Sequence, residues 1–392
     1  MTDPTGDPRP PRNRDAARAG MRSGCPVQPV PAGSGGRPGY TVAGYAEARE
    51  ALSDARLSKD TVAFFAGKES RRRLHPALAQ NMLASDPPRH TRLRKLVTGA
   101  FTTGAVKELR PFIGRVTEDL LHRWPVGERF DLVAGLAVPL PVIVICELLG
   151  VPPTDRTDVR RWSAELFAAG EPDVIDAASH ALADYMRDLI TAKRRAPGGT
   201  LLDRLVSARD GDDHLSEDEL VSLAVLLLVA GHETTTNAIG NAALALLQHP
   251  TELERLRRNP DAIASALDEL LRFDSPVSTA TFRFSTEAIT LGGTDIPAGA
   301  PVLVALGEAN RDPARFAAPD LLDLDRDAAA HLGFGHGIHR CLGAPLARAE
   351  MEIALRAVLT RCPGIRLAVP AEQLCRRRTR LVRGLTSLPV LA

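Results

Sequence analysis

Cysteines and aromatic residues are scarce in this 392-residue chain, and opposite charges nearly cancel. Aromatic residues make up 4%, which argues against a surface that stacks nucleic-acid bases. With 49 Lys and Arg against 48 Asp and Glu, the net charge of +1 offers no field to attract nucleic acid or an anionic membrane. The five cysteines form no C-x-x-C pair and are odd in number, so a disulfide scaffold is excluded and a reducing cytoplasm is expected. They are Cys25, Cys146, Cys341, Cys362 and Cys375.

Long uninterrupted hydrophobic runs are also lacking. Residues 132–150 are nearly all apolar, but Pro139, Pro141 and Glu147 interrupt them, and residues 220–230 are too short to cross a bilayer. Both runs are interpreted as buried core helices, and no association with a membrane is expected. Residues 1–23 have no apolar stretch that would resemble a targeting signal, and their proline and arginine content predicts a disordered lead-in.

Helical patterns dominate the rest of the chain. A hydrophobic content of 44% is enough for a large core. Ser216 and Glu219 form a capping box before the longest helix, which His249 and Pro250 end. The prediction is a mainly α fold with a small β region, in one large domain over 24–392. Helices are expected over 46–53, 89–101, 105–124, 139–149, 155–168, 173–195, 200–209, 216–248, 251–257, 260–272 and 344–360, and short strands at 27–30, at 40–42, within 277–306 and near the C-terminus.

The sharpest chemical signal is the segment HLGFGHGIHRCLGAPLAR at 331–348. A single cysteine, Cys341, lies among glycines just before a helix that has Pro345 near its first turn. The positive end of the helix and its free N–H groups favour the thiolate. The glycines leave room for a flat ligand to approach the backbone. A nucleophile or a metal ligand is therefore expected here.

Four interpretations of Cys341 compete. It is a buried structural cysteine, or a zinc ligand together with His336 and His339, although that spacing fits no common zinc pattern. It is a nucleophile activated by histidine, which would need an orienting partner that the sequence does not reveal. The fourth interpretation is a thiolate ligand of haem iron.

The fourth interpretation is supported by a family resemblance that covers the chain from about residue 24 to its end. The pattern Phe334-x-x-Gly337-x-His339-x-Cys341-x-Gly343 resembles the haem-binding loop of cytochrome P450 enzymes, and most resembles bacterial members that tailor natural products. The resemblance implies a P450 fold, haem b as cofactor, Cys341 as the iron ligand, and O2 as co-substrate. The cofactor-binding residues that it implies are His90, Arg94, Ala230, Arg283, Phe334, Gly335, His339, Cys341 and Gly343.

Further segments of the family are present in the expected order. AGHETT at 230–235 resembles the oxygen-activating stretch of the family's central helix, which implies that Thr234 contacts bound oxygen and that Glu233 relays protons. Without the resemblance, this stretch would be only a helix packing defect with a solvated glutamate. Glu269 and Arg272, at i and i+3, resemble the family's structural ion pair, which Arg326 would complete, although Leu322 stands where the family often has phenylalanine.

The haem propionates would need partners, and four residues match them. His90 and Arg94 lie at i and i+4 on one helical face, Arg283 follows Pro276, and His339 lies in the cysteine loop. Taken singly, each of these side chains is more often a surface charge than a ligand.

The resemblance implies a monooxygenase that inserts one oxygen atom into a C–H or C=C bond of a medium-sized hydrophobic molecule, such as a polyketide, macrolide or peptide-derived metabolite. The sequence has no flavin fingerprint and no iron–sulfur cysteine cluster. Electrons are therefore expected from NAD(P)H through a separate ferredoxin and its reductase, with the protein acting as a cytoplasmic monomer. Candidate docking residues are Arg92, Lys95, Arg340 and Arg348, and candidate pocket segments are 61–85, 163–180, 229–234, 277–281 and 385–387.

Three other functions are compatible with parts of this pattern. An oxidative-coupling enzyme would use the same apparatus without adding oxygen. A hydrolase or transferase with a cysteine nucleophile would be colourless. A haem sensor or carrier would not need the Glu233–Thr234 pair.

Overall fold

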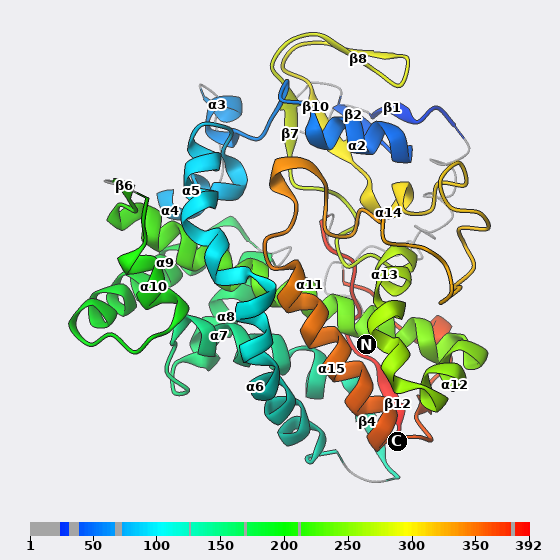
Figure 1. The fold of residues 1–392 in the computed structure, drawn as a ribbon. Helices are drawn as coiled ribbons and strands as arrows, with labels where there is room; N and C mark the ends of the chain where they lie inside the picture. Colours follow the sequence, from blue (N-terminus) through cyan, green and yellow to red (C-terminus); the bar gives the residue numbers. More distant parts are fainter. Residues whose placement is uncertain are drawn as a thin grey trace.

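In the computed structural model of the chain, residues 24–30, 39–66, 73–124, 127–167, 171–210, 213–377 and 381–392 are described. Helices form most of it (Figure 1). The longer ones are α2 (Tyr45–Ser53), α5 (Arg89–Thr98), α6 (Thr103–Leu121), α7 (Pro139–Leu149), α8 (Arg156–Phe167), α9 (Pro172–Arg195), α10 (Leu201–Ser207), α11 (Glu217–Gln248), α12 (Pro250–Arg258), α13 (Ile263–Phe273) and α15 (Ala344–Arg361). Short ones are α3 (Thr61–Phe65), α4 (Pro76–Ala79) and α14 (Leu306–Ala309), with 3-10 turns that include η1 (Met82–Ala84) and η5 (Gly337–His339).

The strands are short and form small sheets, of which the largest lies beside α2 at the top of the view while β4 and β12 lie at the bottom (Figure 1). The largest sheet has the order β1-β2-β10-β7-β3, from Val27–Val30, Gly39–Val42, Pro301–Val304, Arg283–Ser285 and Leu57–Ser58. A second sheet joins β11 (Arg366–Leu367), β12 (Pro389–Leu391) and β4 (Arg129–Asp131). Two hairpins complete the set, β5–β6 (Arg209–Asp210 with Asp213–His214) and β8–β9 (Ile289–Leu291 with Thr294–Ile296). The predicted mainly α fold with a small β region is confirmed.

Helix α11 runs through the centre of the helical part, because almost all of its faces are apolar. It packs against α7, α9 and α15, and most of its residues from Leu220 to Leu246 are buried. A helix that is hydrophobic on all sides has to lie in a core or in a membrane. By length and composition α11 would be able to span a bilayer, but 67% of its most apolar window is buried inside the protein. The sequence argument that 220–230 is too short was therefore wrong about length, while the interpretation as a core helix is confirmed.

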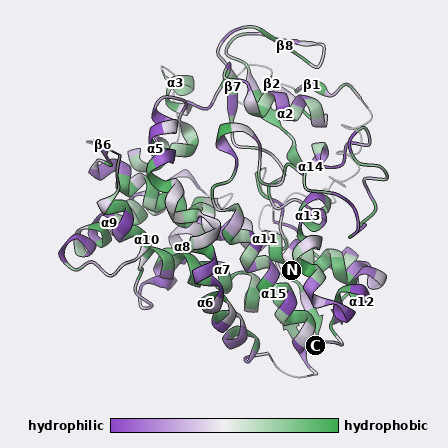
Figure 2. Ribbon diagram, viewed as in Figure 1, coloured by the Kyte–Doolittle hydropathy of each residue, from purple (hydrophilic) through white to green (hydrophobic). Residues whose placement is uncertain are grey.

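Outer helices show the mixed pattern of surface elements. In Figure 2, α9 and α12 carry hydrophilic and hydrophobic residues side by side around the helix. In α12, Leu253 and Leu256 are buried while its arginines remain at the surface. This pattern fixes which face of each outer helix packs on the core.

The sequence predicted the long elements better than the short ones. The predicted capping box is present, since Ser216 Oγ accepts from the Glu219 N–H at 3.3 Å and Glu219 accepts in return from the Ser216 N–H at 3.0 Å. The prediction missed α3, α4, α14 and the π-helical turn η3 (Val133–Ala137). Strands β4, β5 and β6 lie in the middle of the chain, where no strand was predicted. The predicted lead-in at 1–23 lies outside the described residues.

Candidate active site

A cavity of about 660 Å3 lies between α11 and the loop that precedes α15. Its apolar wall comes from η1, α11 and the segments after α13 and near the C-terminus. Lining residues from these segments include Met82, Leu83, Val229, Ala230, Gly231, Thr234, Val277, Ala280, Leu381 and Val382. The opposite wall is the cysteine loop, with Phe334, Gly335, His339, Cys341 and Gly343. The volume is within the range of about 300–1,000 Å3 that is typical of small-molecule sites.

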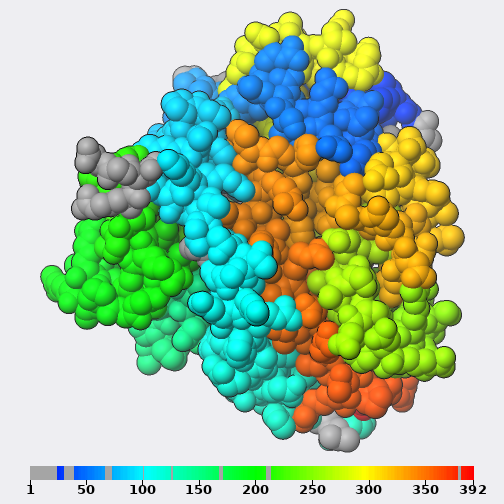
Figure 3. All heavy atoms as spheres, in the orientation of Figure 1, coloured from blue at the N-terminus to red at the C-terminus, as the bar shows by residue number. Residues whose placement is uncertain are grey.

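The cysteine loop is shaped by backbone conformations that favour glycine. Gly335 and Gly337 both have a φ of 71°, in the left-handed region where other residues are strained. The Cys341 N–H donates to the Phe334 carbonyl at 2.8 Å, which closes the loop onto itself. A Cβ atom at Gly337 would lie 2.7 Å from the Leu52 carbonyl, so the loop packs tightly on α2. On the face shown in Figure 3, the orange segment that contains this loop lies between the cyan helices α5 and α6 and the blue α2.

Opposing effects act on the pKa of the Cys341 thiol. Burial raises the pKa of the Cys341 thiol above its ordinary value, while the N–H groups of Gly343 and Ala344 and the nearby Arg94 and Arg340 lower it. Burial outweighs the helix N-terminus, because the sulfur lies deep in the protein although it is accessible from the cavity. The predicted effect of the helix end, which favours the thiolate, is therefore present, but burial opposes it. A coordinated metal would deprotonate the thiol.

Two of the alternatives for Cys341 lose support. Among the described residues, no group of three His, Cys, Asp or Glu side chains is arranged to hold a metal ion, which argues against the zinc site with His336 and His339. No hydrogen bond joins Cys341 Sγ to a histidine in that same part of the chain, and His336 instead contacts Arg49 at 3.4 Å. The nucleophile interpretation has no geometry to support it.

Across the cavity, α11 contributes polar side chains to an otherwise apolar surface. Thr234 Oγ1 donates to the Ala230 carbonyl at 3.1 Å, and both residues line the cavity. Thr235 Oγ1 makes the same kind of bond to Gly231 at 3.3 Å. Side chains that bond to a carbonyl four residues earlier loosen a helix locally. The Thr234 hydroxyl keeps its own acceptor lone pairs for a ligand in the cavity.

Glu233 lies beside the cavity and does not line it. Its Oε2 accepts from Arg377 Nη1 at 2.8 Å, and its Oε1 lies 3.8 Å from His232 Nε2. His232 Nε2 is also 3.2 Å from Ser163 Oγ, and burial lowers the pKa of this histidine. The Glu233 side chain is 8% exposed and that of Arg377 is 31% exposed, so the pair links the interior of α11 to the surface.

The other predicted residues gather at one polar end of the cavity. His90, Arg94, Arg283 and His339 all line it, and His90 and Arg283 are almost completely buried. The rings of His90 and His339 lie 4.1 Å apart. Neither ring nitrogen of His90 has a hydrogen-bond partner, nor does Nε2 of His339. Burial lowers the pKa of His339 to about 2, helped by the positive charge of Lys59.

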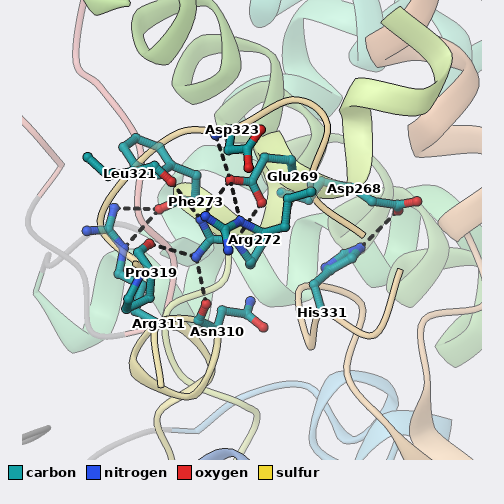
Figure 4. Close-up of polar contacts among 12 residues, drawn as sticks. Asp268, Glu269, Arg272, Phe273, Asn310, Arg311, Pro319, Leu321, Asp323 and His331 are labelled. Atoms are coloured by element: carbon teal, nitrogen blue, oxygen red, sulfur yellow. Dashed lines mark hydrogen bonds and ion pairs between the residues drawn. The ribbon is translucent and has the colours of Figure 1, made fainter. Parts of the chain in front are cut away.

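The predicted Glu269–Arg272 pair is confirmed as a buried structural contact (Figure 4). Arg272 Nε donates to Glu269 Oε2 at 2.6 Å, and Arg326 Nε donates to Glu269 Oε1 at 3.2 Å. The rest of the Arg272 guanidinium donates to main-chain carbonyls of the loop that leads toward the cysteine, at Asn310, Pro319 and Leu321. Leu322 does not prevent Arg326 from completing the group.

Some predicted surface and pocket residues lie elsewhere. Arg92 is paired with Asp213 and Glu219 at 2.7 Å, so its charge is offset locally and it is a weaker docking candidate than predicted. Arg348 is likewise paired with Asp268.

The cavity lining does not include Phe64, Phe65 or Leu385. Phe64 contacts Phe65, Phe282 and Phe284 instead, Leu385 is core, and Leu381 and Val382 line the cavity near the C-terminus. Residues 67–72 and 168–170 of the predicted pocket segments lie outside the described residues.

Two buried charged residues in the cavity wall were missed by the sequence analysis. Lys59 is 2% exposed, and Glu350, on α15, is 1% exposed. Oε2 of Glu350 has no hydrogen-bond partner, and burial raises the pKa of this carboxyl well above its ordinary value. No motif marks either residue, since a single Lys after a strand and a Glu within a helix are common at surfaces.

The residues around the cavity fit a haem. Gly343 has open space where a Cβ would be, and Cys341 lies beside it, facing Ala230 and Thr234 across the cavity. The unpartnered imidazoles of His90 and His339, with Arg94 and Arg283, are the donors that two buried carboxylates would need. An apolar cavity with a thiol on one wall and a cationic end matches a flat, iron-containing ligand with two acidic groups.

Comparisons with known proteins agree with this geometry. The sequence profile of the cytochrome P450 family matches residues 172–364. The cytochrome P450 monooxygenase PikC of Streptomyces venezuelae is 45% identical over 355 residues, covering 90% of this chain and 84% of PikC. The vitamin D(3) 25-hydroxylase of Pseudonocardia autotrophica is also 45% identical, over 97% of this chain and 94% of the hydroxylase.

The solved structure of the tirandamycin C-bound P450 monooxygenase TamI superposes with a TM-score of 0.89 at 46% identity, over 97% of this chain and 98% of TamI. This level of identity extends over nearly the whole length, so the similarity covers the fold together with the segments of the cysteine loop and the central helix. The chain belongs to the cytochrome P450 family and is a monooxygenase of that family.

Proposed function

We propose that this P450 oxidises a medium-sized hydrophobic secondary metabolite, such as a polyketide, macrolide or peptide-derived scaffold, by inserting one oxygen atom into a C–H or C=C bond. The observation that carries the proposal is the apolar wall opposite Cys341, formed by Met82, Leu83, Val229, Val277 and Val382. It offers dispersion contacts and almost no hydrogen bonds, which suits such molecules. The similarity to PikC and to tirandamycin-bound TamI supports the substrate class.

We assign the haem contacts to the residues predicted for them. Cys341 would hold the iron, while His90, Arg94, Arg283 and His339 would hold the propionates. Ala230 would face the haem from α11, and Phe334, Gly335 and Gly343 would shape the loop around it. When bound, haem with a thiolate ligand supplies the activation of O2 and the cleavage of its O–O bond.

The chain's own residues position the substrate and handle protons. The Thr234 hydroxyl donates to the Ala230 carbonyl, so its oxygen is placed to accept a hydrogen bond from a ligand in the cavity. We assign the relay of protons to Glu233, whose carboxylate lies between the cavity side of α11 and the partly exposed Arg377, while the Arg377 guanidinium itself stays protonated. To reach Thr234, the Glu233 carboxylate has to leave Arg377 and turn toward the cavity. The buried α11 keeps bulk water from the site, as proton control requires.

We propose that electrons come from another protein, since the described residues belong to a P450 domain. We propose NAD(P)H as the source, with a ferredoxin and its reductase as carriers, and docking on the face beside the cysteine loop. Arg340 lies in that loop and remains a candidate contact for an acidic partner. We further propose that residues 24–392 form one domain and that the protein works as a cytoplasmic monomer.

The test is a spectrum followed by a product analysis. The dithionite-reduced protein under carbon monoxide should show the red-shifted Soret band of thiolate-ligated haem, and Cys341→Ser should abolish it. Candidate metabolites that shift the spectrum are then turned over under labelled dioxygen. One labelled oxygen atom in the product confirms the insertion, whereas a product that has lost hydrogen without gaining oxygen would show oxidative coupling.

A further inference from the structure

The polar end of the cavity carries more positive charge than the predicted propionate partners supply. Lys59 follows β3 and reaches the same space as Arg94 and Arg283. Its side chain is buried, which is rare for an unpaired lysine. No ion pair within 4.0 Å joins Lys59 to a carboxylate in the described part of the chain.

Lys59 is held in place by contacts on both sides. Its main-chain N–H donates to the Asp86 carboxylate at 3.1 Å, and Ser58 Oγ donates to the same carboxylate at 2.5 Å. At the other end, Lys59 Nζ donates to Thr281 Oγ1 at 2.5 Å. Arg283 Nη1 donates to the Thr281 carbonyl at 3.2 Å. Two cationic groups therefore meet at Thr281, on the wall of the cavity.

The charges at this end do not balance without a ligand. Asp86 is the carboxylate that acts on both Lys59 and Arg283 among the described residues. The three cations Lys59, Arg94 and Arg283 against this single carboxylate leave an excess of about two positive charges. Burying such an excess costs free energy unless an anion arrives to offset it. Burial and the charge of Arg283 both lower the pKa of Lys59, and a bound anion would oppose that effect.

We propose that Lys59 is a third cationic anchor for the haem, and that it shares one propionate with Arg283 at Thr281. Arg94 and His90 are then left for the second propionate. Two propionates carry two negative charges, which matches the excess at this end of the cavity. The inference rests on the proposed haem site and adds a residue to it. Lys59 lines the same cavity as the apolar wall that would contact a substrate, so a carboxylate on a substrate is the competing source of the anion.

The experiment compares three variants by how firmly they hold haem. Lys59→Met keeps the length of the side chain and removes its charge, Lys59→Arg restores a charge, and Lys107→Met is a control on the exposed face of α6. The first readout is the rate of haem transfer to excess apomyoglobin, followed by the Soret band. The second readout is the reduction potential of the iron in the substrate-free protein.

Lys59→Met should lose haem roughly ten- to a hundredfold faster than the wild type, because one charge-assisted hydrogen bond is removed. Its potential should become more negative, since a positive charge near the iron has gone. Lys59→Arg should recover most of both properties, and Lys107→Met should match the wild type. If Lys59→Met does not fold, Lys59→Gln is measured in its place under the same expectations.

Two results would overturn the inference. One is a Lys59→Met variant whose rate of haem transfer is within about twofold of the wild-type rate and whose reduction potential is within about a few millivolts of the wild-type value. The other is the same unchanged haem behaviour with weaker binding of substrates that carry a carboxylate, which would assign Lys59 to the substrate. If the wild type itself binds no haem, the proposed function fails first, and the two failures are distinguishable.

Discussion

Single residues inside the cavity wall determine its chemistry, and Thr234 is the most direct case. Thr234→Ala removes a hydroxyl that Ala230 holds at the cavity surface. We expect oxygen and NAD(P)H consumption to continue while product per oxygen consumed falls by about tenfold, because proton delivery by a positioned group is lost. Thr234→Ser keeps the hydroxyl and should retain most of the yield. Equal yields in the alanine variant and the wild type would remove Thr234 from the relay.

Glu350 makes a prediction about stability. Burial raises the pKa of this carboxyl, so the folded state binds a proton that the unfolded state releases above about pH 4.3. Stability should therefore fall as the pH rises from the unfolded pKa toward the folded one. Glu350→Gln keeps the shape without the proton, so it should be as stable as wild type at pH 4 and melt about 2 °C or more higher at pH 8.

Glu352→Gln on the same helix is the control for Glu350. Glu352 accepts from Arg110 at 2.8 Å, so removing its charge should lower stability instead of raising it. A Glu350→Gln variant that gains nothing at pH 8 would mean that the carboxyl is charged and has a partner in solution.

The role of a residue could be predicted where the residues that define this role lie close together in the sequence. Cys341 and its glycines lie within ten positions, and their pattern is readable because the loop conformation requires those residue types. Lys59 meets Thr281 across more than two hundred positions, and nothing near either residue indicates that they meet. The burial of Cys341 by distant segments, which opposes the effect of the adjacent helix end, could not be predicted for the same reason.

At the scale of elements, the C-terminal segment is fastened to the helices by buried charge. Arg376 donates to Asp274 Oδ2 at 2.8 Å and Arg383 donates to Asp274 Oδ1 at 2.7 Å, just after α13. Asn241 of α11 donates to the Arg383 carbonyl at 2.9 Å. Because Leu381 and Val382 line the cavity, these contacts fix one wall of the substrate space.

Asp274→Asn should loosen this segment. Burial raises the pKa of Asp274, but Arg376 and Arg383 outweigh it and hold the pKa below its ordinary value. The stabilisation is therefore present at neutral pH and is lost as the pH falls below the unfolded value, about 3.9. At pH 7 we expect a loss of about 3 kcal/mol, since two half-buried arginines lose the buried carboxylate that both of them contact.

Hydrogen exchange checks the Asp274 prediction. Exchange should quicken in residues 381–392 and remain unchanged in α6. Asp261→Asn, which removes an exposed carboxylate paired with Arg356, should change neither stability nor exchange. Unchanged exchange in both variants would contradict the fastening role.

Elements were predictable where they are long. The long apolar segment, the Ser216–Glu219 capping box and the stop at His249 and Pro250 predict α11 to within a residue or two. Strand β4 is three residues long and is defined by pairing with β12, more than 250 positions away. Its own sequence, Arg129 to Asp131, has no strand signal that would distinguish it from a turn. Such elements depend on contacts that form only in the folded chain.

At the scale of the whole molecule, two hydrophobic clusters meet around the cavity. The larger cluster belongs to the helices and the smaller to the main sheet and α2. Fold class and order of segments were predictable because every long element and the family pattern agree. The packing of the two clusters against each other was not predictable, because it depends on irregular loops between residues 306 and 343. The Glu269 network is the contact that fixes these loops to α13 (Figure 4).

Glu269→Gln tests whether that network holds the molecule together. Arg272 is completely buried, so loss of the carboxylate leaves a charge with neutral partners only. The expected cost is about 3–5 kcal/mol, a large part of the total stability of a folded protein. Unfolding in urea is followed in parallel by circular dichroism and by the Soret band, and both transitions should move to lower urea together. Glu254→Gln, which removes an exposed partner of Arg258, should cost under about 0.5 kcal/mol. If the Soret transition moved while circular dichroism did not, the network would hold only the cysteine loop and not the two clusters.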